Sequence, residues 1–481
     1  MLPFPTSTAI TGQCVIQRCG CRGTPTQLKK EGVFHMAIEK KWEEMTWQEK
    51  REERFKKWLN PSMVKFISPE AEKLYQQRVT RLIKAIKLEE PDRVPVMLPT
   101  GNFPAYYAGS SYYEVSYDYD KLKKAWIKFM DDFGDMDMSP THMISSGPIA
   151  EALQSRVIKV PGIGLPKDAS MHNICEGEYM KADEYDRLMM DPSDYYMRVT
   201  MPRTMGLFES FAKLPTLRNS QAAQWIAALS DPDIRKTFQT LMDLGDEQKK
   251  FMAAQAQIAM TALSRGYPSF RGMNVMAGAP FDHYADLLRA THGIVLDMYR
   301  QPKKLHEAME HQLQLELANI KNVPVGSSPV CFIALHKGDD TFMSDKQFEE
   351  FYWPYLRKIF IAMIEEGLVP MPFAEGRYTR RLKQITDTPK SGVIWWFDQT
   401  DMAEAKKYLG GIACIIGNVP TSIVKTGTKE QVKETCRKLI ETCAPGGGYI
   451  LAGGASVDKG KFENFKAMME AAYEYGVYKK S

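Results

Sequence analysis

The sequence predicts an α/β fold, a (β/α)8 TIM barrel with an N-terminal helical extension. Its second half contains five short apolar runs, each of which ends in a polar or glycine-rich turn. Helix-like segments separate the runs at intervals of roughly 20 to 40 residues, and this alternation is typical of βα units in a parallel sheet. The runs are VCFIAL (330–335), LVPMPF (368–373), GVIWWF (392–397), ACIIG (413–417) and YILAGG (449–454).

A doubly wound open sheet is the alternative to the barrel. The sequence contains no GxGxxG turn, P-loop or GxSxG elbow, so the usual sites of open sheets are unsupported. Polar residues at several successive strand ends favour a barrel, because barrel active sites lie on that face. The expected helices of this half are 345–366, 378–385, 402–409, 429–443 and 459–475.

The chain divides into three predicted parts. Residues 1–35 show no periodicity, and we expect a non-native or disordered extension, with translation starting at Met36. Residues 36–90 have the charged, amphipathic pattern of helices. Residues 91–481 form the predicted barrel, with earlier strands at VPVMLPT (94–100), around MDMSPTHMI (136–144) and at FRGMNVMAG (270–278). Residues 156–182, rich in Gly, Pro and Ile, are expected to leave the barrel as an irregular excursion or a hairpin.

Composition excludes several classes of function. A net charge of +4 on 481 residues, without a basic block, gives no case for nucleic-acid binding. No apolar run reaches the ~18 residues that span a bilayer, so we expect a cytoplasmic protein without membrane association. The eight cysteines lack metal-site spacing and are expected to be reduced thiols.

Three residues at predicted strand ends are catalytic candidates. Glu375 follows the run that ends at Phe373, and it could be a proton acceptor, a metal ligand or only an acid at the start of the next helix. His336 follows the run 330–335 and could act as a general acid or, with Glu375, bind zinc. Asp401 is the better N-cap for the helix from Met402, which leaves Asp398 for the pocket.

Further polar residues near the same strand ends are candidates for binding a substrate. Cationic side chains there could neutralise a carboxylate or pair with neighbouring acids, and amides could donate hydrogen bonds or only close turns. These candidates are Asp340, Lys337, Arg377, Asn418, Asn102 and His283.

Five segments resemble the uroporphyrinogen decarboxylase superfamily, which also contains cobalamin-dependent methyltransferases. The similarity covers roughly residues 75–478 in consistent order and spacing, and it implies the barrel fold. The segments are RLIKAIKLEEPDRVPV, AGAPFDHYADLLRATHGIVLDMYRQPKKLHEAMEHQ, FMSDKQFEEFYWPYLRKI, GNVPTSIVKTGTKEQVKETCRKLIE and GGGYILAGGASVDKGKFENFKAMMEAAYEYG.

Two departures from the family pattern bear on activity. Family decarboxylases carry an Arg-Gln-Ala-Gly-Arg motif after the first strand, whereas residues 99–104 read PTGNFP without arginine. The methyltransferase branch carries a zinc-binding His-x-Cys motif and a later Cys. Here those places hold Glu375-Gly376-Arg377 and, at about the later position, Ala455. Neither thiolate ligand of that branch's thiol-activating zinc site is therefore present.

The resemblance implies an enzyme of the corrinoid-dependent methyltransferase branch. It would move a methyl group between a small methylated substrate, such as an O-methyl compound, and a corrinoid (cobalamin) on a partner protein. The partner is needed because the chain has no Asp-x-His-x-x-Gly motif and no recognisable cobalamin-binding domain. The alternatives are a uroporphyrinogen decarboxylase-type carboxy-lyase and a non-catalytic ligand-binding barrel.

Overall fold

The computed structural model describes residues 40–141, 143–217, 221–272, 277–321, 323–326 and 328–479. The chain forms two units, Met1–Glu44 and Met45–Ser481. Within the first unit, the described residues include the short 3-10 helix η1 (Trp42–Glu44). The predictions for residues 1–35 and for a start at Met36 lie outside the described residues. The helices predicted between 45 and 90 belong to the same unit as the barrel.

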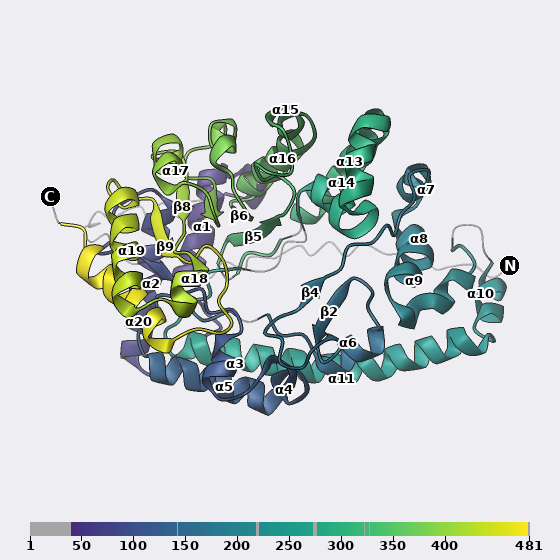
Figure 1. Cartoon of the computed structure of the whole chain (residues 1–481), viewed down its shortest axis with the longest axis horizontal. Coiled ribbons are helices and arrows are strands. Elements are labelled where there is room, and N and C mark those ends of the chain that lie inside the picture. Colours follow the sequence, from purple (N-terminus) through teal and green to yellow (C-terminus); the bar gives the residue numbers. More distant parts are fainter. Residues whose placement is uncertain are drawn as a thin grey trace, which may run out of the picture. The chain divides into compact units, whose positions relative to one another are not determined.

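A parallel sheet of six strands forms the centre of the larger unit (Figure 1). Each of the five predicted apolar runs contains one strand, and neighbouring strands pair in parallel. In spatial order the strands are β1 (Val96–Met97), β9 (Tyr449–Ala452), β8 (Cys414–Ile416), β7 (Ile394–Phe397), β6 (Val369–Ala374) and β5 (Val330–Leu335).

Two extended segments take the second and third strand positions of the barrel, between β1 and β5. The amide of Ser139 donates to the carbonyl of Pro268 at 2.9 Å, and the amide of Gly272 donates to the carbonyl of Val330 at 2.7 Å. The amide of Val96 in β1 donates to the Asp137 carboxylate at 2.8 Å instead of to a backbone carbonyl. This side-chain bond explains why the segment around Asp137 is not a regular strand.

The interior of the barrel is one apolar cluster to which every strand position contributes. Because side chains alternate along a strand, residues two apart face the same side. The lumen-facing members from the strands and the two extended segments are Met97, Met138, Phe270, Val330, Val369, Met371, Ile394, Trp396, Cys414, Ile416, Ile450 and Ala452, with Phe332 and Phe373 packed against them. This ring of residues confirms the predicted (β/α)8 barrel.

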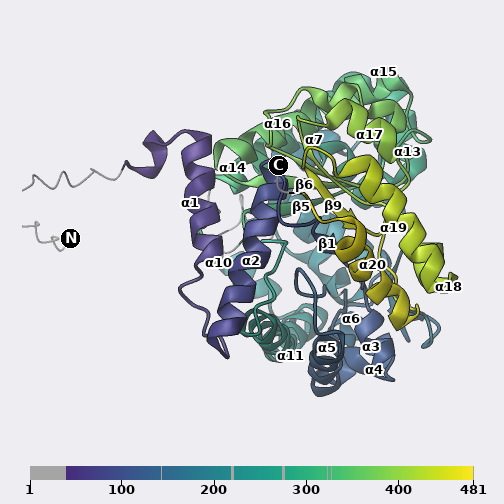
Figure 2. The same ribbon diagram turned by 90° about the vertical axis from the view of Figure 1, so that its left-hand side faces the viewer.

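Two N-terminal helices contribute to the same cluster. They are α1 (Trp47–Leu59) and α2 (Pro69–Ile86), which run side by side in Figure 2. Tyr75, Val79 and Leu82 of α2 join the cluster that contains Val330 and Val369, the first residues of β5 and β6. α2 therefore closes the barrel at the amino ends of the strands, which leaves the carboxyl ends as the open mouth.

Helices on the outside of the sheet follow their strands, and most match the predicted bounds. Ser344, Asp401 and Thr428 cap helix starts with their side chains, which explains those boundaries. The helices are α15 (Asp345–Gln347), π-helical η5 (Phe348–Tyr352), α16 (Trp353–Glu365), α17 (Met402–Leu409), α18 (Thr421–Thr426), α19 (Lys429–Cys443) and α20 (Phe462–Tyr475).

The predicted helix 378–385 is wrong. Its place is taken by two short 3-10 turns, η6 (Thr379–Arg381) and η7 (Gln384–Thr386). The reason is Arg381, whose buried guanidinium donates to the carbonyls of Gly338 at 3.2 Å and Asp339 at 3.1 Å in the turn after β5. These long-range bonds fix the segment in a conformation that a regular helix would not allow.

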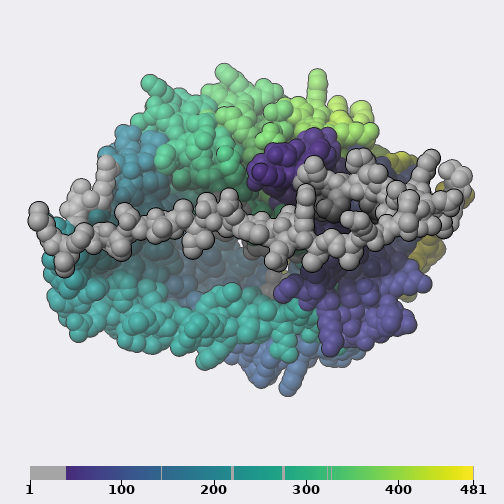
Figure 3. Space-filling view, turned by 180° about the vertical axis from the view of Figure 1, so that it is seen from behind, coloured from purple at the N-terminus to yellow at the C-terminus, as the bar shows by residue number. Residues whose placement is uncertain are grey.

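A long excursion separates the second and third barrel positions. It contains the predicted irregular element as a small sheet of β2 (Ile158–Pro161), β3 (Gly164–Leu165) and β4 (Asn173–Ile174). Helix α11 (Pro232–Ser264) brings the chain back to the barrel and forms the lower teal surface in Figure 3. The other elements are α6 (Gly147–Leu153), α7 (Tyr185–Met190), α8 (Pro192–Tyr195), η2 (Tyr196–Thr200), α9 (Met201–Thr204), η3 (Gly206–Lys213) and α10 (Ala222–Ala228).

The remaining helices flank the barrel on either side of this excursion. They are α3 (Phe103–Tyr107), α4 (Tyr112–Tyr117), α5 (Tyr119–Phe133), α12 (Pro280–Tyr284), η4 (Ala285–Arg289), α13 (Ala290–Arg300) and α14 (Pro302–Ile320). Among the described residues, no helix combines the length and the apolar character needed to span a bilayer.

Asp137 holds the first two barrel positions together with charged hydrogen bonds. Its carboxylate is 1% exposed and accepts from Arg81 at 2.5 Å and from Arg93 at 2.7 and 2.8 Å, besides the amide of Val96. A buried ion pair is costly to break, because removing one partner leaves the other charge without compensation.

We predict that Asp137→Ala destabilises the protein by about 3–5 kcal/mol, because two arginines and one amide lose their acceptor. Chemical denaturation followed by circular dichroism measures the change. Asp183→Ala, at an exposed carboxylate, is the control and should change stability by less than about 0.5 kcal/mol. Equal stabilities of the two variants would contradict this role of Asp137.

Candidate functional site

The polar residues predicted at the strand ends occupy the lumen-facing positions at the barrel mouth. Glu375 and Asp398 lie two residues beyond the lumen residues Phe373 and Trp396, and His336 lies four beyond Phe332. Side chains at these spacings point to the same side of a strand. The alternation that builds the apolar interior therefore also directs these side chains inward, one level above it.

Three aromatic side chains form the floor beneath them. The ring of Phe373 lies 4.4 Å from that of Trp396, and Phe332 lies 6.3 Å from Phe373 and 6.2 Å from Trp396. The indole nitrogen of Trp396 donates to the carbonyl of Gly453 at 2.9 Å, which fixes its orientation. We call Phe332, Phe373 and Trp396 the aromatic floor. Phe332 and Phe373 are only partly buried, so the floor presents an apolar, aromatic surface to the mouth.

His336 is held by a carboxylate on one side and faces a second carboxylate on the other. Its Nδ1 lies 2.5 Å from Asp286 in η4, and its Nε2 lies 3.6 Å from Glu375. The hydrogen bond that Nδ1 donates to the Asp286 carboxylate raises the pKa of His336 to about 9, against the opposing effect of burial. His336 is therefore an imidazolium at neutral pH, with Nδ1 occupied and Nε2 directed toward Glu375 beyond hydrogen-bond distance.

Asp282 fixes the backbone on which His336 sits. Its carboxylate accepts from the amides of His336 at 2.9 Å and Lys337 at 3.1 Å, and from the hydroxyl of Tyr352 at 2.7 Å. Burial raises the pKa of Asp282 to about 6, with Asp286 adding a second, smaller contribution. Three donors on one buried carboxylate hold the end of β5 in place.

A hydrogen bond from Gly376, the residue directly after Glu375, links the Glu375 turn to Asp398. The amide of Gly376 donates to Asp398 at 3.1 Å, and Gly376 has a φ of +81°, a conformation that side chains other than glycine rarely adopt. Burial raises the pKa of both carboxyls, and for Glu375 the neighbouring Asp398 and Asp286 raise it further while His336 opposes them. Although 54% of the Glu375 side chain is exposed, its carboxyl lies among these charges.

Glu375 does not act as a helix cap. The 3-10 turn η6 that follows it begins after Tyr378, and no side chain caps it. The arginines behind Glu375 serve other partners, since Arg380 pairs with Asp345 at 2.8 Å and Arg381 also bonds Asp345. These contacts leave Glu375 free for chemistry at the mouth.

Lys337 connects the mouth to the excursion. Its Nζ lies 2.7 Å from Glu176, 3.1 Å from the hydroxyl of Thr291 and 3.6 Å from Asp286. These acids raise the pKa of Lys337 against the effect of burial. The ammonium is thus paired within the protein, and it balances the negative charge around His336.

The other predicted substrate-binding residues make contacts within the protein. The side chain of Asn102 is buried, donates to the carbonyl of Ser170 at 3.3 Å and accepts from the amide of Met143 at 3.0 Å. Asn418 donates to the carbonyls of Asp398 at 3.0 Å and Thr400 at 2.7 Å, so it supports the turn that carries Asp398.

The remaining three candidates lie to the sides of this group. Asp340 accepts from the amide of Arg380 at 3.0 Å, and burial raises its pKa. Arg377 is exposed. His283 lies 2.6 Å from the hydroxyl of Tyr196, and burial lowers its pKa to about 4, so it is a neutral imidazole. The structure therefore brings together His336, Glu375, Asp398 and Lys337 of the predicted set.

Sequence reasoning missed the acids that define the state of His336. Asp282 and Asp286 stand four residues apart on consecutive helical turns, in the segment PFDHYADLL. That spacing places two carboxylates on one side of a helix, which is a signal for a shared partner. The partner itself lies about fifty residues further along the chain, where local patterns carry no information about it.

The described part of the chain holds no group of three or more His, Cys, Asp and Glu side chains arranged to bind a metal ion. The site offers one imidazole whose Nδ1 is taken by Asp286, and it offers no thiolate. This donor set does not fit the tetrahedral nitrogen and sulfur ligation of a zinc site. The described cysteines are unpaired, and four of the five are buried.

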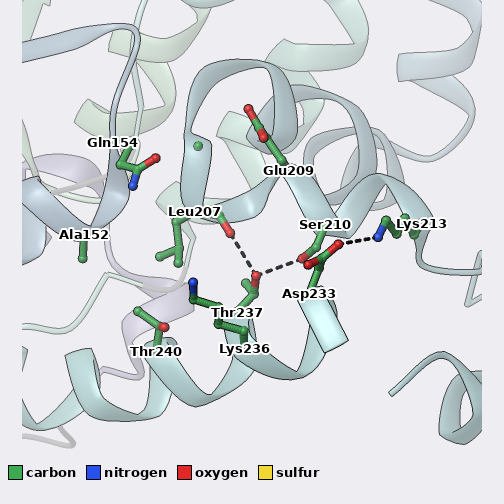
Figure 4. Close-up of a pocket in the computed structure, with 11 residues that line it drawn as sticks. Ala152, Gln154, Leu207, Glu209, Ser210, Lys213, Asp233, Lys236, Thr237 and Thr240 are labelled. Atoms are coloured by element: carbon green, nitrogen blue, oxygen red, sulfur yellow. Dashed lines mark hydrogen bonds and ion pairs between the residues drawn. The ribbon is translucent and has the colours of Figure 1, made fainter. Parts of the chain in front are cut away.

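A cavity of 480 Å³ lies elsewhere, between η3 and α11 (Figure 4). The hydroxyl of Thr237 bonds Ser210 at 2.9 Å and the carbonyl of Leu207 at 3.1 Å, and Lys213 pairs with Asp233 at 2.7 Å. These bonds pair Thr237, Ser210, Lys213 and Asp233 within the protein.

Comparison with known proteins agrees with the architecture. A family model described as uroporphyrinogen decarboxylase matches residues 230–475, more than half of the chain. Among solved structures, a methyltransferase from Methanosarcina mazei superposes with a TM-score of 0.51 at 16% identity, covering 84% of this chain and 98% of that one. At this identity the likeness supports the fold. The comparison with curated proteins found no match.

We predict that His336 titrates with a midpoint near pH 9 in NMR spectra of the labelled imidazole, because Asp286 stabilises the imidazolium. Asp286→Asn should move the midpoint down to 6.5 or below. Glu176→Gln, which removes an acid bonded to Lys337, is the control and should move it far less. A wild-type midpoint near 6.5 would contradict the assignment.

The same raised pKa predicts a pH dependence of stability. A group whose pKa is higher in the folded state contributes stability that is complete below its unfolded pKa, 6.5, and is lost as pH rises through about 9. The difference in stability between the wild type and His336→Asn should therefore shrink between pH 6.5 and 9. Denaturant titrations at several pH values measure this, and a constant difference would count against it.

Proposed function

This chain belongs to the uroporphyrinogen decarboxylase family, and from that premise we propose that it is a methyltransferase. It moves a methyl group from a small O-methylated compound to a corrinoid carried by a partner protein. The observation that carries the proposal is the position of the His336 ring, whose Nδ1 lies 2.5 Å from Asp286 while Nε2 lies 3.6 Å from Glu375 at the mouth. That arrangement is a positioned proton donor.

Transfer of a methyl group from oxygen needs a proton donor. The carbon–oxygen bond breaks with both electrons remaining on oxygen, and the methyl carbon forms its new bond with the reduced cobalt, which supplies the electron pair. An alkoxide or phenolate is a poor leaving group, so protonation of the oxygen lowers the barrier. Nε2 of His336 supplies this proton and leaves a neutral imidazole, still oriented by Asp286.

Glu375 restores the proton to His336. Its carboxylate lies 3.6 Å from Nε2, and 54% of the side chain is exposed, so it can exchange protons with solvent. The raised pKa of Glu375 brings its proton affinity nearer to that of the imidazole. Asp398 contributes negative charge behind Glu375 and holds the amide of Gly376.

The methyl acceptor approaches from outside the barrel. The side chain of His336 is 34% exposed and that of Glu375 is 54% exposed. The proton donor, His336, can therefore be reached from the solvent side of the mouth. We therefore place the corrinoid on a partner protein, because the chain itself carries no Asp-x-His-x-x-Gly motif to hold one.

The first strand's loop argues against decarboxylation of a porphyrinogen. That substrate carries many carboxylates, which cationic side chains would have to bind. Thr100 and Asn102 take the place where family decarboxylases have arginines, and both are buried at 0% exposure. The side chain of Asn102 is also engaged with Ser170 and Met143.

We predict that His336→Gln lowers methyl transfer from an aryl methyl ether to free cob(I)alamin by about 10²- to 10⁴-fold, because the proton donor is lost. Spectroscopy of the cobalamin follows the transfer, with metal content and circular dichroism recorded on the same samples. His306→Gln, at an imidazole bonded to Tyr355 outside the site, should retain wild-type activity.

Three other results would contradict the proposal. Release of carbon dioxide from a carboxylated substrate without methyl transfer would favour a decarboxylase. Ligand binding without turnover would favour a non-catalytic barrel. Full activity of His336→Gln would remove His336 from the reaction even if methyl transfer occurs.

A further inference from the structure

An arginine that has no acidic partner among the described residues extends into the barrel lumen. The guanidinium carbon of Arg271 lies 4.0 Å from the centre of the Phe332 ring and 5.5 Å from that of Trp396, two members of the aromatic floor. Arg271 comes from the third barrel position, which the amide of Gly272 anchors to Val330. At Gly272 a Cβ would lie 1.9 Å from the carbonyl oxygen of Ser328, so the close approach requires glycine.

Arg271, which is half-buried, differs from the buried arginines that the structure describes. Those side chains donate to carboxylates or carbonyls, as expected for buried cations. They are Arg51, Arg54, Arg78, Arg81, Arg93, Arg289 and Arg381. The guanidinium of Arg271 donates to no group among the described residues, and its Nε is buried without an acceptor.

The charge of Arg271 is retained in this setting. Burial lowers the pKa of Arg271 to about 10, which leaves the side chain cationic at neutral pH. Stacking on Phe332 and Trp396 stabilises the cation in part, yet its buried Nε has no acceptor among the described residues. An unmatched cation costs stability in the free protein and is matched when an anion binds.

The neighbourhood defines what kind of anion fits. The planar guanidinium binds a planar carboxylate through two parallel hydrogen bonds. Phe332, Phe373 and Trp396 offer ring surfaces beside it, which suits a flat aromatic body. His336 and Glu375 lie further toward the mouth on the same lumen face as Phe332 and Phe373.

We propose that Arg271 binds the carboxylate of the substrate, and that the substrate is a small aromatic acid whose ring rests on the aromatic floor. Its methoxy group then points to the mouth, toward His336. The position of the methoxy group rests on the proposed function, whereas binding of the aromatic carboxylate does not. Arg271 thereby selects the substrate and sets which end of it reaches the proton donor.

Calorimetry with 4-methoxybenzoate and its neutral analogue 4-methoxybenzamide tests the binding claim. We expect the wild type to bind the acid at least about 10-fold more tightly than the amide, and Arg271→Gln to weaken binding of the acid by about 10- to 100-fold. Binding of the amide should change little in this variant. Arg271→Lys should recover part of the loss, since it keeps the charge without the planar fork.

Arg187→Gln is the matched control, because Arg187 also stacks on an aromatic ring, that of Tyr195 at 5.8 Å, but is exposed and outside the barrel mouth. It should bind the acid like the wild type. Arg271→Met should unfold at the same or a higher temperature than the wild type, because it removes a half-buried charge whose Nε has no acceptor among the described residues. A lower melting temperature combined with unchanged affinity for the acid would show a packing role and overturn the proposal.

The two proposals fail separately. If 4-methoxybenzoate binds through Arg271 but no methyl group is transferred, the carboxylate site holds and the proposed function fails. If neutral aryl methyl ethers are demethylated as fast as the acid, and Arg271→Gln does not change this, the proposed function holds and the carboxylate site fails. Equal affinity of the wild type for the acid and the amide would also overturn the role of Arg271.

Discussion

The alternation of side chains along the parallel strands is the constraint on which the rest of this structure depends. Residues two apart share a face, so each strand that contributes an apolar residue to the lumen also directs its strand-end residue toward the mouth. Phe373 leads to Glu375 and Trp396 leads to Asp398 in this way. The same backbone geometry therefore builds the core and gathers the candidate site, and a shift of one residue would reverse both.

The charges around the site set the pKa values of its two proton-transfer residues, His336 and Glu375. Asp286 on η4 holds His336 as an imidazolium, while burial and the neighbouring acids raise the pKa of Glu375. Both groups thus have a raised pKa, and at 3.6 Å they can pass a proton between them. Arg271 adds an unmatched cation deeper in the same lumen. An anionic aromatic ligand would satisfy that cation and place its other end beside His336.

Much of the barrel was predictable from the sequence because its signals are local. Apolar runs with polar ends identify β5 to β9, and the capping oxygen of Asp401 accepts from the amides of Ala403 and Glu404 as expected. The second strand position was harder to predict, since the Asp137 carboxylate, and not a backbone carbonyl, accepts from the amide of Val96. The helix expected at 378–385 failed because Arg381 bonds carbonyls some forty residues away.

The candidate site was predicted in part, because its strand-end residues also follow from local sequence signals. His336, Glu375 and Asp398 follow recognisable strands, but the acids that hold His336 in place and raise its pKa, Asp282 and Asp286, come from α12 and η4.

The central claim is that Asp286 keeps His336 protonated for the reaction. The most direct measurement is the pH dependence of kcat/KM for methyl transfer in the wild type and in Asp286→Asn. The claim predicts a wild-type rate that falls above about pH 9 and a fall shifted to lower pH in the variant. A basic limb at the same pH in both proteins would contradict it.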